Sequence, residues 1–258
     1  MPAGLLIVGS FKASDGSWTL KNISDLAQPF ILRAYRNSIQ VSLVTAVVGG
    51  LIGFMLAYAV TLGGLPSVIR SWLVAFAGVA SNFAGVPLSY AFISTLGRTG
   101  VVTALIKTAG VDIYRQGFSL YTFAGLSLVY LYFQLPLMML IMMPALEGLK
   151  REWREASENL GASGMQYWRY VALPVLLPSI LGTMILLFGN AFGAYATAWA
   201  LTGGTLDLVT IMIGAQIRGN VLYNPGLGYA LALGMIVVMG LSIGLYTLLQ
   251  RRSERWLR

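Results

Sequence analysis

Long runs without charged residues define the pattern of this chain. No Asp, Glu, Lys or Arg occurs in 37–69, 71–97, 116–146, 170–206 or 219–250. A helix of about 20 apolar residues crosses the hydrocarbon core of a bilayer, so each run is long enough for one span and too short for two. Backbone amides in lipid must pair within the segment, which only a helix allows here. The pattern therefore predicts spanning helices over 37–62, 71–96, 118–146, 172–202 and 225–250.

Two shorter apolar segments lie outside these runs. Pro2 to Phe11 is mostly apolar but too short to cross a bilayer. It has neither the basic start nor the cleavage site of a signal peptide, so it is interpreted as the last turns of a first span. A late start codon and a true half-span both remain open. Within 97–117 we expect a short surface helix with an apolar face, made by Val101, Val102, Leu105 and Ile106.

Composition narrows the class of protein. Of the 258 residues, 57% are hydrophobic and 10% are charged, whereas soluble domains carry about 25% charged residues. A soluble enzyme is thereby excluded. The chain has no Cys and no His, so it has no disulfide, thiolate ligand or imidazole base. We expect one transmembrane domain over 1–258, with no metal and no nucleic-acid partner.

The basic residues give weak guidance on orientation. If 147–171 is cytoplasmic, nine Lys and Arg lie inside and eight lie outside, which is almost no bias under the positive-inside rule. The inside set is Arg70, Lys150, Arg151, Arg154, Arg169, Arg251, Arg252, Arg255 and Arg258. The outside set is Lys12, Lys21, Arg33, Arg36, Arg98, Lys107, Arg115 and Arg218. The orientation of the chain in the membrane is therefore inferred from the chemistry of the 147–171 loop.

That loop has a distinct pattern of helix formers and breakers. Residues 147–160 are rich in Glu, Leu, Ala and Arg, which favour a helix. Gly161 interrupts it and Ser163-Gly164 follows, so we expect a helix, a bend and a second short helix. Trp153, Ala156 and Leu160 share one face at spacings of three and four residues. Pro174 and Pro178 mark where the chain re-enters the bilayer.

The same loop resembles the signature loop of permease subunits of binding-protein-dependent ABC importers. The residues concerned are Glu155-Ala156-Ser157, Gly161-Ala162-Ser163 and Leu173-Pro174, at the family's spacing. Ser157 stands where the family's motif has Ala, which is a small departure from the pattern. The resemblance implies an all-α, multi-pass protein of the bacterial plasma (inner) membrane. It would have a type I ABC importer permease-like bundle with five full spans and a truncated first span. The alternative is an ordinary amphipathic loop in which Gly161 only ends a helix.

The resemblance also implies partners and roles. The loop would couple to a separate ATP-binding subunit through Glu155, Ala156, Ser157, Leu160, Gly161 and Ala162. Glu155 would pair with a basic residue there, the small residues would allow close approach, and Gly161 would set the bend. Two ATP-binding subunits holding ATP and Mg²⁺, a second permease subunit and an extracytoplasmic binding protein would complete the importer. This chain would carry no cofactor and no catalytic residue, since it has no Gly-rich phosphate loop ending in Gly-Lys-Ser/Thr.

A substrate pathway needs polar groups within the spans. The candidates are Asn82, Tyr130, Tyr132, Gln134, Asn190, Tyr195 and Thr197. Tyr faces can hold a cation, but hydrogen bonding between helices is the favoured interpretation for any one of these residues. Gly49, Gly50, Gly53, Gly189 and Gly193 are expected to let helices pack closely.

The segment Phe188 to Tyr195, with Thr202-Gly203-Gly204, most resembles the spermidine/putrescine permease group, which implies a polyamine or similar small organic ion. Related permeases are associated with aminoethylphosphonate, thiamine, ferric ion, sulfate or molybdate. Two other classes remain. A channel or facilitator would work without ATP, and a membrane-embedded enzyme would lack His, Cys and acidic residues in its spans.

Overall fold

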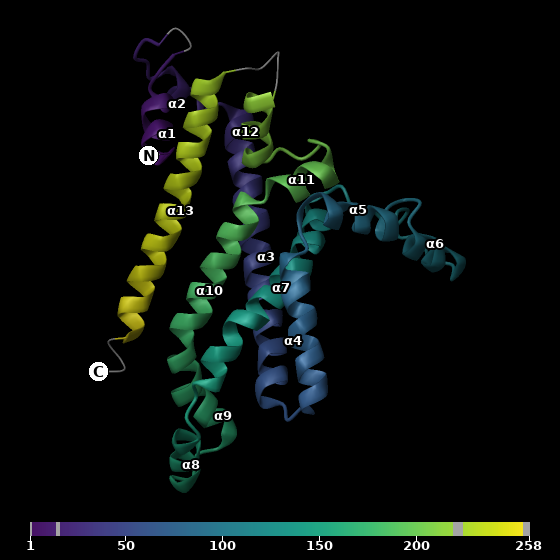
Figure 1. Ribbon diagram of the computed structural model, residues 1–258, viewed down its shortest axis with the longest axis vertical. Helices are drawn as coiled ribbons and strands as arrows, with labels where there is room; N and C mark the ends of the chain where they lie inside the picture. The colour runs from purple at the N-terminus through teal and green to yellow at the C-terminus, as the bar shows by residue number, and fades with distance from the viewer. Residues whose placement is uncertain (1, 14–15, 219–223, 255–258) are drawn as a thin grey trace. The chain divides into compact units, whose positions relative to one another are not determined.

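Helices make up the regular secondary structure of the described residues, apart from one isolated β-bridge between Lys12 and Trp18. The computed structural model describes residues 2–13, 16–218 and 224–254 (Figure 1). Its helices are α1 (Pro2–Ser10), α2 (Lys21–Asp25), α3 (Pro29–Leu62), α4 (Ser67–Asn82), α5 (Gly85–Leu96), α6 (Val101–Thr108), α7 (Phe123–Glu147), α8 (Arg151–Asn159), α9 (Gly164–Tyr167), the π-helix η1 (Trp168–Ala172), α10 (Leu173–Gly193), α11 (Tyr195–Thr202), α12 (Val209–Arg218) and α13 (Pro225–Glu254). The predicted all-α class is confirmed.

The apolar runs correspond to the long helices. Four segments are long and apolar enough to cross a membrane: Pro29–Leu62, Phe123–Glu147, Gly164–Gly193 and Pro225–Leu248. A fifth is provided by α4 together with the segment Gly85–Thr108, which contains α5 and α6, if this bent pair is counted as one broken span. The expected spans are therefore in the right places, although α3 begins eight residues earlier than predicted.

A single helix over 71–96 was the wrong prediction. α4 ends at Asn82 and α5 begins at Gly85, with Ala84 in an extended conformation between them. Gly85 has φ +76°, in the left-handed region that a residue with a Cβ rarely adopts. Pro87 lies in the first turn of α5, where its missing N–H costs no helical bond. These two residues start a new helix inside an apolar run.

The helix predicted over 172–202 differs at both ends. It begins upstream, because α9, η1 and α10 are continuous from Gly164 to Gly193. The π turn is closed by the Leu173 N–H, which donates to the Trp168 carbonyl. Pro174 follows directly and has no N–H, so the regular α pattern cannot continue through this point. At the other end, Ala194 interrupts the helix and α11 starts at Tyr195.

The surface helix predicted in 97–117 is confirmed as α6, and its apolar face is largely exposed. Val101 and Leu105 are 65% and 63% exposed, and the buried residue of α6 is Thr103. In a membrane protein an exposed apolar face is not penalised, because lipid covers it as well as protein does.

The chain forms two compact units. The first contains Met1–Val44, Ala84–Tyr130 and Gly189–Leu241, and the second contains Thr45–Phe83, Leu131–Phe188 and Ser242–Arg258. Four of the boundaries between the two units fall within helices, namely α3, α7, α10 and α13. Among the described residues, each basic residue expected outside belongs to the first unit and each one expected inside belongs to the second.

Glycines bring helices together within each unit, as the sequence predicted for four of five positions. A Cβ at Gly50 would lie 2.7 Å from the Met184 side chain, and one at Gly53 would lie 2.8 Å from the Leu135 carbonyl oxygen. Gly49 faces Gln134 and Gly189 faces Met239 in the same way. Gly193 is the exception, since no described residue lies within 4 Å of the position that a Cβ would take there. It ends α10 and does not support packing.

Candidate functional site

The loop between α7 and α10 forms two short helices joined by a bend, as predicted (Figure 1). The bend is a glycine C-cap. The Gly161 N–H donates to the Glu158 carbonyl at 2.9 Å and the Ala162 N–H to the Ser157 carbonyl at 3.0 Å. This is the Schellman pattern, which satisfies the last carbonyls of a helix and needs a left-handed residue. Gly161 supplies it with φ +76°.

The second short helix is fixed by a capping box. The Ser163 N–H donates to Gln166 Oε1 at 2.7 Å, and the Gln166 N–H donates to Ser163 Oγ at 3.3 Å. Each side chain thus satisfies a backbone donor of the other residue. The bend is therefore closed on both sides by local hydrogen bonds, and its shape is encoded by residues 157–166 alone.

One part of the loop prediction was wrong. The helix expected from residue 147 to 160 is divided, because α7 ends at Glu147 and α8 begins at Arg151. Lys150 is extended, with ψ 135°. The favourable helix propensity of this stretch is thus overridden at Gly148-Leu149-Lys150, and α8 becomes a separate element with its own direction.

The surface of α8 is fully accessible. None of its residues is buried, and just after it Leu160 is 88% exposed. Met165 in α9 is 78% exposed, and Trp153 is 36% exposed. The predicted apolar face therefore has no covering element among the described residues. Large apolar side chains exposed on one short loop are typical of a contact surface for another protein.

The charges on α8 pair with one another. Arg151 Nε lies 2.9 Å from Glu155 Oε1, and Arg154 Nε lies 3.0 Å from Glu158 Oε1. Such exposed pairs at a spacing of four residues contribute about 0.3–0.5 kcal/mol each. Glu155 can therefore exchange Arg151 for another basic partner at small cost. Its neighbour Ser157 is occupied locally, because Oγ donates to the Arg154 carbonyl at 2.8 Å.

The base of the loop is held by contacts that the sequence did not reveal. Arg70, at the start of α4, forms an ion pair with Glu147, the last residue of α7. On the other side, the rings of Tyr58 and Trp168 meet edge to face with centroids 5.2 Å apart. Both contacts join residues that are distant in sequence. The only indication of them in the sequence was Arg70, a single charged residue between two apolar runs.

Three of the predicted pathway residues are buried and hydrogen-bonded. The Tyr130 hydroxyl donates to the Ala194 carbonyl at 2.9 Å. Thr197 Oγ1 accepts from the Gly85 N–H at 2.8 Å and joins α11 to α5. Gln134 Nε2 donates to Thr45 Oγ1 at 3.2 Å, while Oε1 is buried with no hydrogen-bond partner in the described part of the chain. These residues support the interpretation as bonds between helices.

The other four predicted pathway residues are accessible to different extents. Asn82 and Asn190 are exposed, and Asn82 donates to the Gly78 carbonyl of its own helix at 2.9 Å. Tyr132 and Tyr195 are half-buried against aromatic neighbours, Phe83 at 6.3 Å and Trp199 at 6.4 Å between ring centroids. No cluster of three or more His, Cys, Asp or Glu that could hold a metal occurs within 2–13, 16–218 and 224–254.

Comparison with known sequences identifies the family of this chain. Residues 113–255, more than half of the chain, match the family described as "Binding-protein-dependent transport system inner membrane component". A probable sulfate transport system permease protein of Helicosporidium sp. subsp. Simulium jonesii is 24% identical over 79% of this chain and 73% of its own. A spermidine/putrescine transport system permease protein of Haemophilus influenzae is 26% identical over 98% of this chain and 91% of its own. Relatives with different substrates are thus about equally similar, so no substrate is singled out.

Comparison with solved structures supports the fold. The chain superposes on a bacterial ABC transporter "involved in the import of the acidic polysaccharide alginate" with a TM-score of 0.76, at 16% identity, over 97% of this chain and 88% of that one. A second alginate transporter structure, in complex with its pentasaccharide-bound periplasmic protein, gives 0.73 at 14% identity over the same shares. With the family match and the apolar helices, this chain belongs to the inner-membrane permease components of binding-protein-dependent ABC importers and is a multi-pass membrane protein.

Proposed function

We propose that the α8–α9 loop is the coupling element through which a separate ATP-binding subunit drives transport. The observation that carries this proposal is a bend fixed by local hydrogen bonds, in a loop that exposes the apolar side chains of Leu160 and Met165 and the carboxylate of Glu155. The side chains of Leu160 and Met165 are 88% and 78% exposed, and exposure of apolar surface to water is unfavourable unless a partner covers it. Their burial against a partner would contribute about 25 cal/mol for each Å² of apolar surface removed from water.

Each residue of the proposed contact has a role that follows from its position. Glu155 would leave Arg151, to which it is bound at 2.9 Å, and pair with a basic residue of the partner. Ala156 and Ser157 are small and allow close approach, while Gly161 and Ala162 fix the bend through their backbone N–H groups. Leu160 supplies the apolar anchor. Together they form a surface with an apolar centre and a charged edge, which is the usual anatomy of a protein interface.

Movement of this loop would reach the membrane through the helix that follows it. α9, η1 and α10 are continuous from Gly164 to Gly193, so displacement of the loop displaces α10 with it. The ion pair of Arg70 with Glu147 would carry the same displacement to α4. Closure of two ATP-binding subunits would then switch the permease between inward- and outward-facing states as a rigid-body movement.

The proposed assembly follows from this mechanism. The chain would form half of the pathway beside a second permease subunit, the same or related, with two ATP-binding subunits that hold ATP and Mg²⁺. An extracytoplasmic binding protein would deliver the substrate, and ATP would be hydrolysed by the partners alone. The proposed substrate is a polyamine or similar small organic ion, supported by the spermidine/putrescine relative that covers 98% of this chain. Uptake assays with polyamines, sulfate and thiamine test this choice.

Co-purification tests the coupling proposal. The tagged permease is co-expressed with its ATP-binding subunit and recovered from membranes, as wild type, Leu160→Asp or Leu105→Asp. Leu105 is a matched control, because it is an exposed leucine in α6, in the first unit. We expect only Leu160→Asp to lose the ATP-binding subunit. Equal recovery with all three forms, or substrate uptake into vesicles that lack ATP, would support a facilitator instead.

A further inference from the structure

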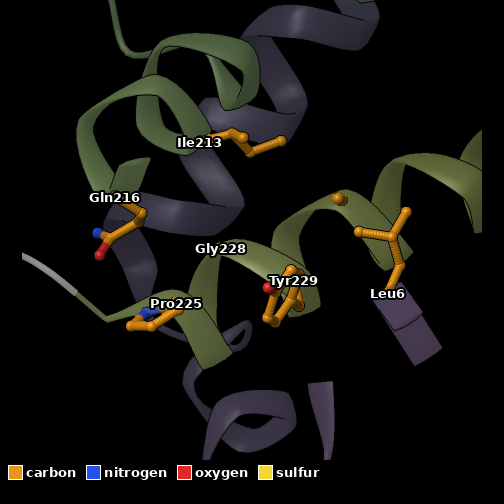
Figure 2. A pocket seen from close by; sticks show the side chains of 7 residues that line it. Leu6, Ile213, Gln216, Pro225, Gly228 and Tyr229 are labelled. Atoms are coloured by element: carbon orange, nitrogen blue, oxygen red, sulfur yellow. The ribbon is translucent and has the colours of Figure 1, made fainter. Parts of the chain in front are cut away.

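A cavity in the first unit is lined by no residue of the coupling loop and by none of the predicted pathway residues. Its volume is about 310 Å³, near the lower end for sites that bind small molecules. Figure 2 shows it between three helices: Leu6 comes from α1, Ile213 and Gln216 from α12, and Pro225, Gly228 and Tyr229 from α13. Ala232 completes the lining one turn further along α13.

The chemistry of the lining selects an apolar ligand. No residue that lines the cavity carries a charge, so an ionic substrate would lose its hydration there without compensation. The polar groups are the amide of Gln216, which is 8% exposed, and the Tyr229 hydroxyl. Gln216 Oε1 accepts from the Asn224 N–H at 3.1 Å, which leaves the Nε2 group as a donor without an acceptor among the described residues. The site therefore suits a hydrocarbon chain that carries a hydrogen-bond acceptor at one end.

The position of the cavity indicates where such a ligand comes from. It lies along the first two turns of α13, at one end of the candidate span Pro225–Leu248. Only 6% of the apolar window of that span is buried, so the described part of the chain leaves most of the surface of α13 uncovered. Ile236, one turn beyond Ala232 on the same face, is 46% exposed. The cavity thus lies on the same face of α13 as the exposed Ile236, and Tyr229 stands at the end of the candidate span, where tyrosine is enriched in membrane proteins.

We propose that this cavity binds one acyl chain of a membrane phospholipid, with the ester carbonyl accepting a hydrogen bond from Gln216. The chain would fill the space beside Ile213 and Ala232, and the Tyr229 ring would cover it. The Tyr229 ring itself has a fixed place, because it packs directly against the backbone of Gly9, where a Cβ would find no room. A bound lipid would join α1, α12 and α13 through a shared apolar contact.

Photo-crosslinking tests this proposal. The full chain is reconstituted in vesicles of phosphatidylethanolamine and phosphatidylglycerol that contain a trace of phosphatidylethanolamine with a diazirine in one acyl chain. After illumination, mass spectrometry locates the labelled peptides. We expect labelling on α12 at Ile213, which lines the cavity, as well as on the exposed face of α13.

Variants distinguish the cavity from general contact with lipid. Ala232→Phe and Ile213→Trp fill the cavity and should abolish labelling of α12, while labelling at Ile236 continues. Val237→Phe adds the same ring as Ala232→Phe at a position that is 53% exposed on α13, and should leave α12 labelled. Circular dichroism and gel filtration confirm that each variant is folded.

Two results would overturn the proposal. The first is an α12 that stays unlabelled in the wild type, or labelling of α12 that survives both filling variants. The second is dissociation of a second permease subunit from the purified complex when the cavity is filled, because the occupant would then be a protein side chain and not a lipid.

Discussion

Replacement of Gly161 tests whether the shape of the bend matters for coupling. Gly161 has φ +76°, and no heavy atom lies within 4 Å of the position that a Cβ would take. An added methyl group therefore meets no steric obstacle, and the effect of Gly161→Ala comes from the backbone alone. A left-handed conformation costs an L-residue about 1–2 kcal/mol, which corresponds to a factor of about 5–30 in an equilibrium.

That penalty should appear in binding to the ATP-binding subunit. If docking requires the native bend, Gly161→Ala weakens the affinity by up to about 5–30-fold, because the docking-competent conformer becomes that much rarer. Gly161→Asn should weaken it less, since Asn tolerates the left-handed region better than other residues with a Cβ. Gly161→Val should weaken it most, because branching at Cβ adds further restriction.

The assay measures the affinity of detergent-solubilised permease for its ATP-binding subunit, together with stimulation of ATPase activity in liposomes. Gly164→Ala is the matched control, since Gly164 is also in open space but lacks the positive φ. Alanine is a better helix former than glycine, so this variant should bind at least as well as the wild type. Equal affinity for Gly and Ala at position 161, or an equal loss at 164, would refute the reasoning.

Three further predictions concern the rest of the structure. Arg70→Glu should lower the melting temperature and transport by breaking the pair with Glu147, and the double variant Arg70→Glu/Glu147→Arg should recover both, although an exposed pair contributes only about 0–1 kcal/mol. Tyr130→Phe should cost about 0.6 kcal/mol of stability, the average for a hydrogen bond between membrane helices, measured as a shift in chemical unfolding. Gly53→Leu should cost about 1–3 kcal/mol by overpacking against α7, whereas Gly78→Leu, which meets nothing within 4 Å, should leave the melting temperature unchanged.

Much of the architecture could be predicted because the membrane imposes strong rules. A run of apolar residues long enough to cross a bilayer has to be helical, so the apolar runs predicted the positions of the long helices to within several residues. The bend at Gly161 was predictable for a different reason. A glycine after a run of helix formers, followed by Ser163, specifies a C-cap and a new N-cap locally.

The breaks within the apolar runs could not be predicted from hydropathy. Hydropathy reports that a segment prefers lipid, and it is the same on both sides of a break. Gly85 and Pro87 did carry a signal for the break at Ala84, but glycine and proline also occur inside membrane helices. At the break at Ala194, no glycine or proline follows Gly193 within the next turn. The Ala194 carbonyl instead accepts a hydrogen bond from the Tyr130 hydroxyl, a residue distant in sequence.

The polar residues of the spans show the same limit. Sequence identified Gln134 and Asn190 as equivalent polar residues in apolar helices, yet Gln134 is 0% exposed and Asn190 lies at the surface. A helix that is apolar all round gives no indication of which face meets protein. Burial of a single amide is set by the neighbouring helices, and only the structure shows which of them approach.

A single engineered cysteine tests the central claim most directly, because the chain contains no other. Cysteine at position 160 is reacted with a membrane-impermeant maleimide in inside-out vesicles, in the presence and absence of the ATP-binding subunit. Leu160 is 88% exposed in this chain, so the account predicts rapid labelling of the permease alone and protection in the complex. Labelling that is unchanged by the ATP-binding subunit, or that occurs only from the opposite side of the membrane, would contradict the coupling role of the α8–α9 loop.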